Sequence, residues 1–121
     1  MTRPATLLVA SLLPEKGYCG VQTHARAIIG FARRQGLQAR LVDPHQTNRW
    51  IRRPPSLVTR LLRRIKPERA VMWHRAWAER FVRARLRREL DGLRDQAVVV
   101  YAQDPLSARA ALALRDAGYR F

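Results

Sequence analysis

The stretch that most constrains the fold is residues 5–43, where an apolar run, a glycine-bearing loop, an amphipathic segment and a second apolar run follow one another. Residues 5–13 are almost continuously apolar, which favours a parallel strand covered on both faces over a strand with one face exposed to solvent. Residues 21–35 place apolar side chains at i, i+4, i+7, i+8 and i+11, the spacing of one helical stripe. Residues 37–42 predict a second strand. The order predicts a βαβ unit, and open parallel sheets bind ligands at the carboxyl ends of their strands.

The glycines of this unit lie where a glycine has a physical role. Gly17 and Gly20 belong to the strand-to-helix loop, where glycine lets backbone N–H groups approach a ligand and a helix start favours an anion. Gly36 follows the helix and predicts a left-handed cap. The spacing of Gly17-Tyr18-Cys19-Gly20 is neither a dinucleotide fingerprint nor a P-loop, so it does not indicate a dinucleotide site.

After the second strand the sequence predicts a loop and two basic helices. Residues 45–55 show no helical or strand-like hydrophobic period and end in two prolines, which predicts a loop. Residues 57–65 predict a short helix with one apolar and one arginine-rich face, and residues 68–93 predict a longer helix with two apolar ridges. Trp73 and Trp77 begin one ridge. Interleaved tryptophan and arginine occur in helices that lie on membranes, but aromatic stripes more often belong to a core, so we expect this ridge to face the sheet.

A third strand and a further helix close the chain. Residues 97–102 are apolar and predict a buried strand. Asp104 or Pro105 is expected to begin a helix that ends at Gly118. Residues 119–121 look like the beginning of another strand, so the pattern predicts a truncated domain with an incomplete sheet.

The charge of the chain is concentrated in its middle third. The 24 basic and nine acidic residues give +15, and residues 49–94 alone hold fifteen basic and four acidic residues, or +11. This asymmetry favours an anionic partner, such as a nucleic acid, an acidic membrane surface or a phosphorylated substrate. Arginine outnumbers lysine 22 to 2, a bias typical of a GC-rich genome, so solvated surface charge explains the excess equally well. The candidate membrane or anion contacts are Arg60, Arg63, Arg64, Arg83, Arg87 and Arg88.

The sequence lacks the residues that several classes of function require. The one cysteine, Cys19, excludes an internal disulfide and a multi-cysteine metal site. Glu15, Asp43, Asp104 and His24 lie near the predicted carboxyl edge, but no catalytic set is complete, so we predict no catalytic residue, metal site or cofactor. The sequence carries no helix-turn-helix, zinc or single-strand-binding signature, which argues against nucleic acid.

The expected location is the cytoplasm. No stretch is long and apolar enough to span a bilayer. The apolar run of residues 5–13 leads directly into a glycine loop and an amphipathic segment, so we interpret it as a core strand rather than a signal peptide.

Two segments of the chain resemble glycosyltransferase family 4. Residues 17–27 resemble its signature G-G-[VI]-E-T-H-x-x-x-L, with Gly20 at the second glycine and Thr23 and His24 at the T-H pair. Residues 98–108 look like a later strand and turn of that family, V-V-H-A-H-D-P-L-S-A.

The sequence also departs from the family pattern. Cys19 replaces the first glycine and Gln22 replaces the usual Glu, so the contact of this loop with a donor stays open. Tyr101 and Gln103 stand where many relatives have His.

The resemblance implies an α/β, Rossmann-like parallel sheet that corresponds, over residues 1–121, to the amino-terminal half of a GT-B architecture. The implied activity is retaining transfer of a sugar from a nucleotide-sugar donor to a glycan or lipid-linked acceptor, and this domain mainly holds the acceptor. The implied donor- or acceptor-binding residues are Gly17, Gly20, Thr23, His24, Gln103 and Asp104. The family's catalytic-type His, its E-x7-E motif and its nucleotide-sugar pocket are not among these residues, so we expect the chain alone to be inactive.

Residues 44–94 would then be a basic helical insertion. Some members of the family dock on membranes through such helices, so the same role at the inner face of the membrane is expected here. The alternative is a non-catalytic arginine-rich module that binds acidic membrane or nucleic acid, and a further one is a complete flavodoxin-like nucleotide binder. An exposed sheet edge also predicts marginal stability or association.

Overall fold

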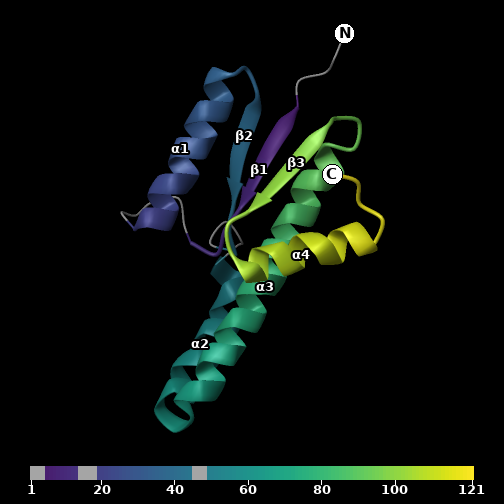
Figure 1. Cartoon of the computed structure of the whole chain (residues 1–121). Helices are drawn as coiled ribbons and strands as arrows, with labels where there is room; N and C mark the ends of the chain where they lie inside the picture. The colour runs from purple at the N-terminus through teal and green to yellow at the C-terminus, as the bar shows by residue number, and fades with distance from the viewer. Residues whose placement is uncertain (1–4, 14–18, 45–48) are drawn as a thin grey trace.

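The computed structural model describes residues 5–13, 19–44 and 49–121, except for the side chains of residues 49–52. The described residues form an α/β domain with a three-stranded parallel sheet and four helices. In chain order the elements are β1 (Thr6–Ala10), α1 (Gly20–Arg34), β2 (Gln38–Val42), α2 (Arg49–Ile65), α3 (Pro67–Gly92), β3 (Val98–Ala102) and α4 (Pro105–Asp116). Figure 1 shows the sheet with helices around it and a hairpin of α2 and α3 that extends beyond the carboxyl ends of the strands.

The sheet has the strand order β2-β1-β3, and both pairs are parallel. Thr6, the first residue of β1, lies opposite Gln38 of β2 and Val98 of β3. The chain moves from β1 to β2 on one side and then crosses back to β3 on the other. This reversal makes the carboxyl ends of β1 and β3 a topological switch point, where open α/β sheets bind ligands.

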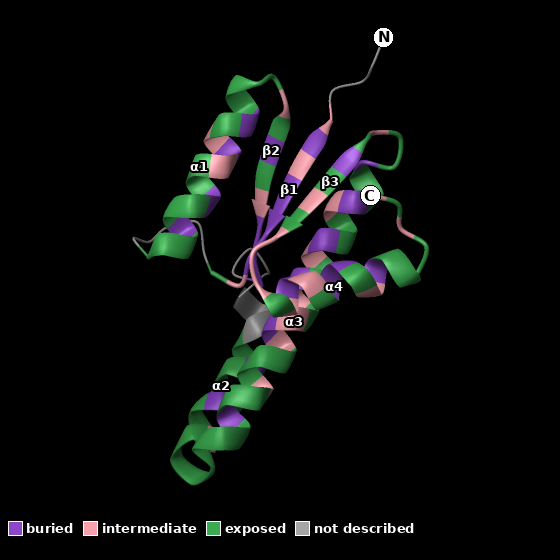
Figure 2. Cartoon of the chain, in the orientation of Figure 1, coloured by how far each residue is buried: buried purple, intermediate pink, exposed green. Residues whose placement is uncertain are grey.

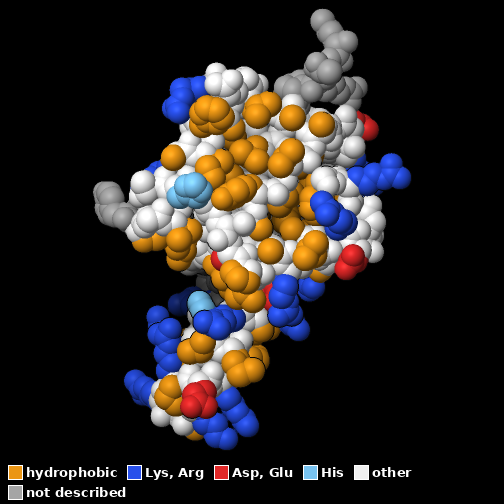
Figure 3. Space-filling view, in the orientation of Figure 1, with side chains coloured by type: hydrophobic (Ala, Val, Ile, Leu, Met, Phe, Trp, Pro, Cys, Tyr) orange, Lys and Arg blue, Asp and Glu red, His pale blue; other side chains and the backbone are white. Residues whose placement is uncertain are grey.

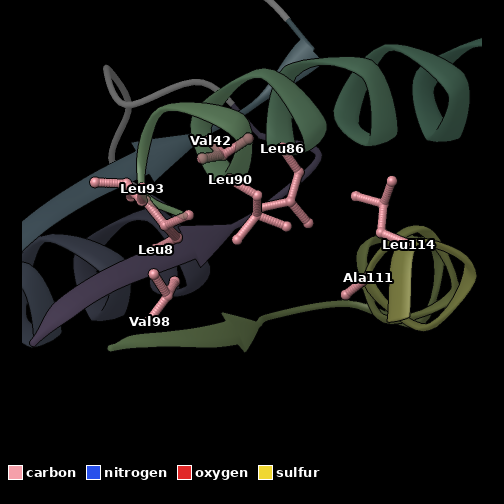
Figure 4. Packing of buried hydrophobic residues seen from close by; sticks show 8 residues of the cluster. All are labelled: Leu8, Val42, Leu86, Leu90, Leu93, Val98, Ala111 and Leu114. Atoms are coloured by element: carbon pink, nitrogen blue, oxygen red, sulfur yellow. The ribbon is translucent and has the colours of Figure 1, made fainter. Parts of the chain in front are cut away.

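Successive residues of β1 belong to different cores, as expected for a strand covered on both faces. Val9 packs with the buried face of α1, at Ala25 and Ile29. Leu8 packs on the other face, with α3 and α4. The buried residues of this second cluster, drawn in Figure 4, are Leu8, Val42, Leu86, Leu90, Leu93, Val98, Ala111 and Leu114.

Helix α2 differs from its prediction. The loop expected over residues 45–55 is wrong from residue 49 onward, because Pro54 and Pro55 lie inside the helix; residues 45–48 lie outside the described part. A proline within a helix removes a hydrogen bond and frees a carbonyl. The carbonyl that a proline frees lies four residues before it, so Pro54 and Pro55 free those of residues 50 and 51. Contact with α3 offsets part of this cost elsewhere in the helix: the carbonyl of Pro55 accepts a bond from Trp73 Nε1 of α3 at 3.1 Å, and another from Thr59 Oγ1 of α2 itself at 2.9 Å.

The aliphatic ridge of α3, and not its aromatic ridge, packs on the sheet. Val82, Leu86 and Leu90 are buried, and Leu86 and Leu90 pack with Leu8 of β1. Trp73 instead contacts α2. The expected orientation of the aromatic ridge is therefore wrong, because the amino-terminal half of this 26-residue helix extends past the sheet and has α2 as its neighbour.

The glycines that follow α1 and α4 have the role that the sequence predicts. Gly36 and Gly118 adopt the positive φ values of 81° and 101° that favour glycine after a helix, as predicted. Tyr119 and Phe121 do not begin a strand; they pack partly against the core cluster of α3 and α4. Of the described helices, none is apolar over enough of its length to cross a membrane.

Candidate functional site

The predicted binding residues come together at the carboxyl edge of the sheet. Gly20, Thr23 and His24 lie in the first turns of α1, and this helix begins at that edge because it follows β1. Gln103 and Asp104 follow β3 directly. Gly17 lies outside the described residues.

The start of α1 is organised by Gln22. The backbone N–H of Cys19 donates to Gln22 Oε1 at 3.3 Å, and the backbone N–H of Thr23 donates to the carbonyl of Cys19 at 3.0 Å. Gln22 is buried, and its bond to the backbone N–H of Cys19 caps the start of α1. A Cβ at Gly20 would meet no atom of the described residues within 4 Å, so packing against them does not require glycine there.

His24 connects α1 to β3 through Tyr101. The Nε2 atom of His24 lies 3.3 Å from the hydroxyl of Tyr101, and their ring centroids are 6.2 Å apart. Both side chains are exposed. Tyr101 was not among the predicted binding residues, although the alternation of β3 places it on the opposite face from the buried Val98, and this could have identified it.

At the carboxyl edge of the sheet, the side-chain amide of Gln103 lacks hydrogen-bond partners among the described residues. Its Nε2 and Oε1 atoms are both buried, and neither has a hydrogen-bond partner in the part of the chain that is described. Its backbone is fixed, since the N–H donates to the carbonyl of Ala10 at 3.0 Å. A buried polar group without a partner costs about 1–3 kcal/mol, and a water or a ligand that reaches this amide would offset that cost.

Asp104 is fully engaged within the chain. Its Oδ1 atom accepts a bond from the backbone N–H of Ser107 at 2.8 Å. Its Oδ2 atom accepts bonds from the Ser107 hydroxyl and from the backbone N–H of Leu12, both at 3.0 Å. The predicted helix start is confirmed, and the carboxylate holds the edge together. Asp43 is buried at the end of β2.

The predicted basic contacts fall into two groups, and all are exposed. Arg60, Arg63 and Arg64 lie on α2 in the hairpin, whereas Arg83, Arg87 and Arg88 lie on the half of α3 that packs on the sheet. Figure 2 shows that most of the hairpin surface is exposed, and Figure 3 shows basic side chains around apolar ones on it. The exposed apolar residues of the hairpin are Leu57, Val58, Leu61, Ile65, Val71 and Met72.

In the described ranges, no three His, Cys, Asp or Glu side chains are placed to hold a metal ion. Comparison of the chain with protein-family models, with curated proteins and with solved structures finds no match. Function therefore has to be inferred from the side chains of this edge and of the hairpin.

Proposed function

We propose that this chain is the amino-terminal, acceptor-side domain of a glycosyltransferase that moves a sugar from a nucleotide-sugar donor to a glycan or lipid-linked acceptor, and that it is inactive alone. The observation that carries the proposal is the unsatisfied amide of Gln103 at the switch point of the sheet. An amide offers two donors and one acceptor oxygen, which suits the hydroxyl groups of a sugar.

The neighbouring groups have complementary roles in this proposal. The amino end of α1, which begins at Gly20, offers backbone N–H groups and a positive dipole end to a phosphate. His24 and Tyr101 are a second polar pair available to acceptor hydroxyls. Asp104 keeps β1 and α4 in place and is a positioning residue.

A second candidate function is docking on an acidic membrane surface, and the hairpin favours it. Leu57, Leu61 and Ile65 follow one another at four-residue spacing on α2 and are 56%, 60% and 64% exposed. A helix with exposed apolar side chains and arginines beside them is suited to lie in the interface of an anionic bilayer. The two functions are compatible, because a lipid-linked acceptor would then lie at the inner face of the membrane, next to the carboxyl edge.

The test of sugar binding uses the side-chain amide of Gln103 as its reporter. The ¹⁵N-labelled chain is titrated with a panel of saccharides and, separately, with uridine and guanosine diphosphate sugars. We expect a saccharide to shift the Gln103 side-chain N–H₂ signals, Gln103→Leu to abolish binding, and the exposed Gln38→Leu at the amino end of β2 to leave binding unchanged. The proposal fails if no saccharide moves these signals. Tight binding of a diphosphate sugar would place the donor site on this chain and contradict the acceptor-side assignment.

A further inference from the structure

A cavity of about 330 Å³ lies where the hairpin meets the segments that follow β1 and β2. This volume is within the range of small-molecule sites, which is about 300–1,000 Å³. Most of its described lining is apolar: Leu12, Leu13, Pro44, Trp77, Ala78 and Phe81. The cavity is separate from the residues proposed to bind sugar, since none of Gly20, His24 and Gln103 lines it.

The aromatic wall of the cavity is preformed. The ring of Trp77 lies between those of Trp73 and Phe81, with centroid distances of 5.8 Å and 5.6 Å. Trp73 is itself fixed by the bond from its Nε1 atom to the carbonyl of Pro55. A wall that is already ordered loses little side-chain entropy when a ligand binds, so the apolar contact contributes to affinity with a small ordering cost.

The polar groups of the lining favour an anion at one end of the ligand. Thr59 lines the cavity, but its hydroxyl donates to the carbonyl of Pro55. His74 and Arg75 are the titratable side chains of the described lining, and none of its members is acidic. Glu79, one turn further along α3, is ion-paired with Arg109 at 3.3 Å. Among the residues that the structure describes, the charge beside the cavity is therefore positive.

We propose that this cavity binds the single apolar chain of an amphiphile whose head group is a phosphate. The chain contacts Trp77 and Phe81, and the head group contacts Arg75. This site does not depend on sugar transfer, because its residues and its ligand are distinct from those of the carboxyl edge. Such an amphiphile reaches the site either as a dissolved monomer or from a bilayer.

The test is a titration of the whole chain with dodecyl phosphate, kept below the concentration at which it forms micelles. Isothermal calorimetry is expected to give saturable binding of one molecule per chain. Inorganic phosphate alone is expected not to bind, and dodecyl maltoside, which has a neutral head group, is expected to bind about tenfold more weakly. A dodecyl chain brominated near its end is expected to quench tryptophan fluorescence, and Trp77→Phe to reduce that quenching.

Two variants separate the cavity from general surface charge. Arg75→Glu is expected to weaken dodecyl phosphate binding about tenfold, whereas Arg69→Glu, which is also exposed on α3 but does not line the cavity, is expected to change it less than twofold. Phe81→Ala tests the chain contact and is expected to weaken binding, with folding checked by circular dichroism.

Three outcomes would overturn the proposal. The first is the absence of saturable binding by monomeric dodecyl phosphate. The second is equal weakening by Arg75→Glu and Arg69→Glu, which would indicate unspecific attraction to the hairpin. The third is binding to anionic vesicles without binding to the monomer, which would assign the lipid contact to the outer surface of the hairpin instead of the cavity.

Discussion

The Oδ2 atom of Asp104 accepts a hydrogen bond from the backbone N–H of Leu12 at 3.0 Å, across 92 positions of sequence. This bond joins the segment after β1 to the first turn of α4. The same carboxylate accepts two bonds from Ser107, so its acceptor groups are used within the chain. An acidic residue in a predicted ligand site therefore determines the shape of that site without having to contact the ligand.

Replacement of Asp104 should destabilise the whole domain. Asp104→Ala removes the N-cap of α4 and leaves the N–H of Leu12 without its partner, and we expect a loss of about 2 kcal/mol in the free energy of unfolding. Urea unfolding followed by circular dichroism measures it. Asp116→Ala, at the exposed end of the same helix, is the control and should stay within about 0.5 kcal/mol. An unchanged urea midpoint for Asp104→Ala would contradict the structural role.

Replacement of Gln103 should raise the stability of the ligand-free chain and abolish saccharide binding. Gln103→Leu replaces an unsatisfied buried amide by an apolar side chain of similar size, so we expect the ligand-free chain to gain about 1–2 kcal/mol of stability. Saccharide binding should be lost in the same variant. Urea unfolding of both proteins without ligand gives the measurement. A less stable variant would mean that the amide already has a partner in the folded chain.

The carboxyl group of Asp91, on α3, should have a pKa below the usual aspartate value. The hydroxyl of Tyr119 donates to its Oδ1 atom at 2.9 Å, and Arg94 does so at 3.2 Å. The bond from Tyr119, with Arg94 second, lowers the pKa of Asp91. Because the pKa of Asp91 is lower in the folded state, its ionised carboxylate stabilises the fold fully above the ordinary aspartate pKa of about 3.9. This stabilisation is lost as the pH falls through the folded-state pKa.

The replacement Tyr119→Phe tests this relation directly. It removes the largest cause of the shift, so the pKa of Asp91 should rise toward the ordinary value. A ¹³C NMR titration of the carboxyl groups measures the change, and Asp116 serves as the internal reference. If the titration of Asp91 is the same in both proteins, the bond from Tyr119 does not persist in solution.

The sequence predicted the sheet and its helix ends because these depend on local patterns. The apolar run at Leu8 and Val9 and the glycines at 36 and 118 each carry their own signal. Pro54 and Pro55 were misjudged because their usual effect is offset by an adjacent helix, and such tertiary compensation is not visible in a local window.

The site was only partly predictable for a related reason. The position of Gln103 after a buried strand could be read from the sequence, but the lack of a partner for its amide depends on every side chain around it. The pairing of His24 with Tyr101 joins residues 77 positions apart. The cavity beside Trp77 needs the angle of the hairpin, which no periodicity specifies.

The hairpin should bind anionic vesicles through both its apolar stripe and its arginines. Vesicles of neutral lipid mixed with phosphatidylserine are expected to co-sediment with the chain, and this binding should weaken as salt rises. Leu61→Asp should reduce the bound fraction because it introduces a charge into the exposed apolar stripe. Arg63→Glu should reduce it through electrostatic repulsion, since each basic residue near an anionic membrane surface contributes about 1 kcal/mol to binding. Leu112→Asp, also exposed but on α4, is the matched control and should bind as the wild type does. If all three variants bind equally well, membrane attachment by the hairpin is wrong, and its basic surface is simply solvated.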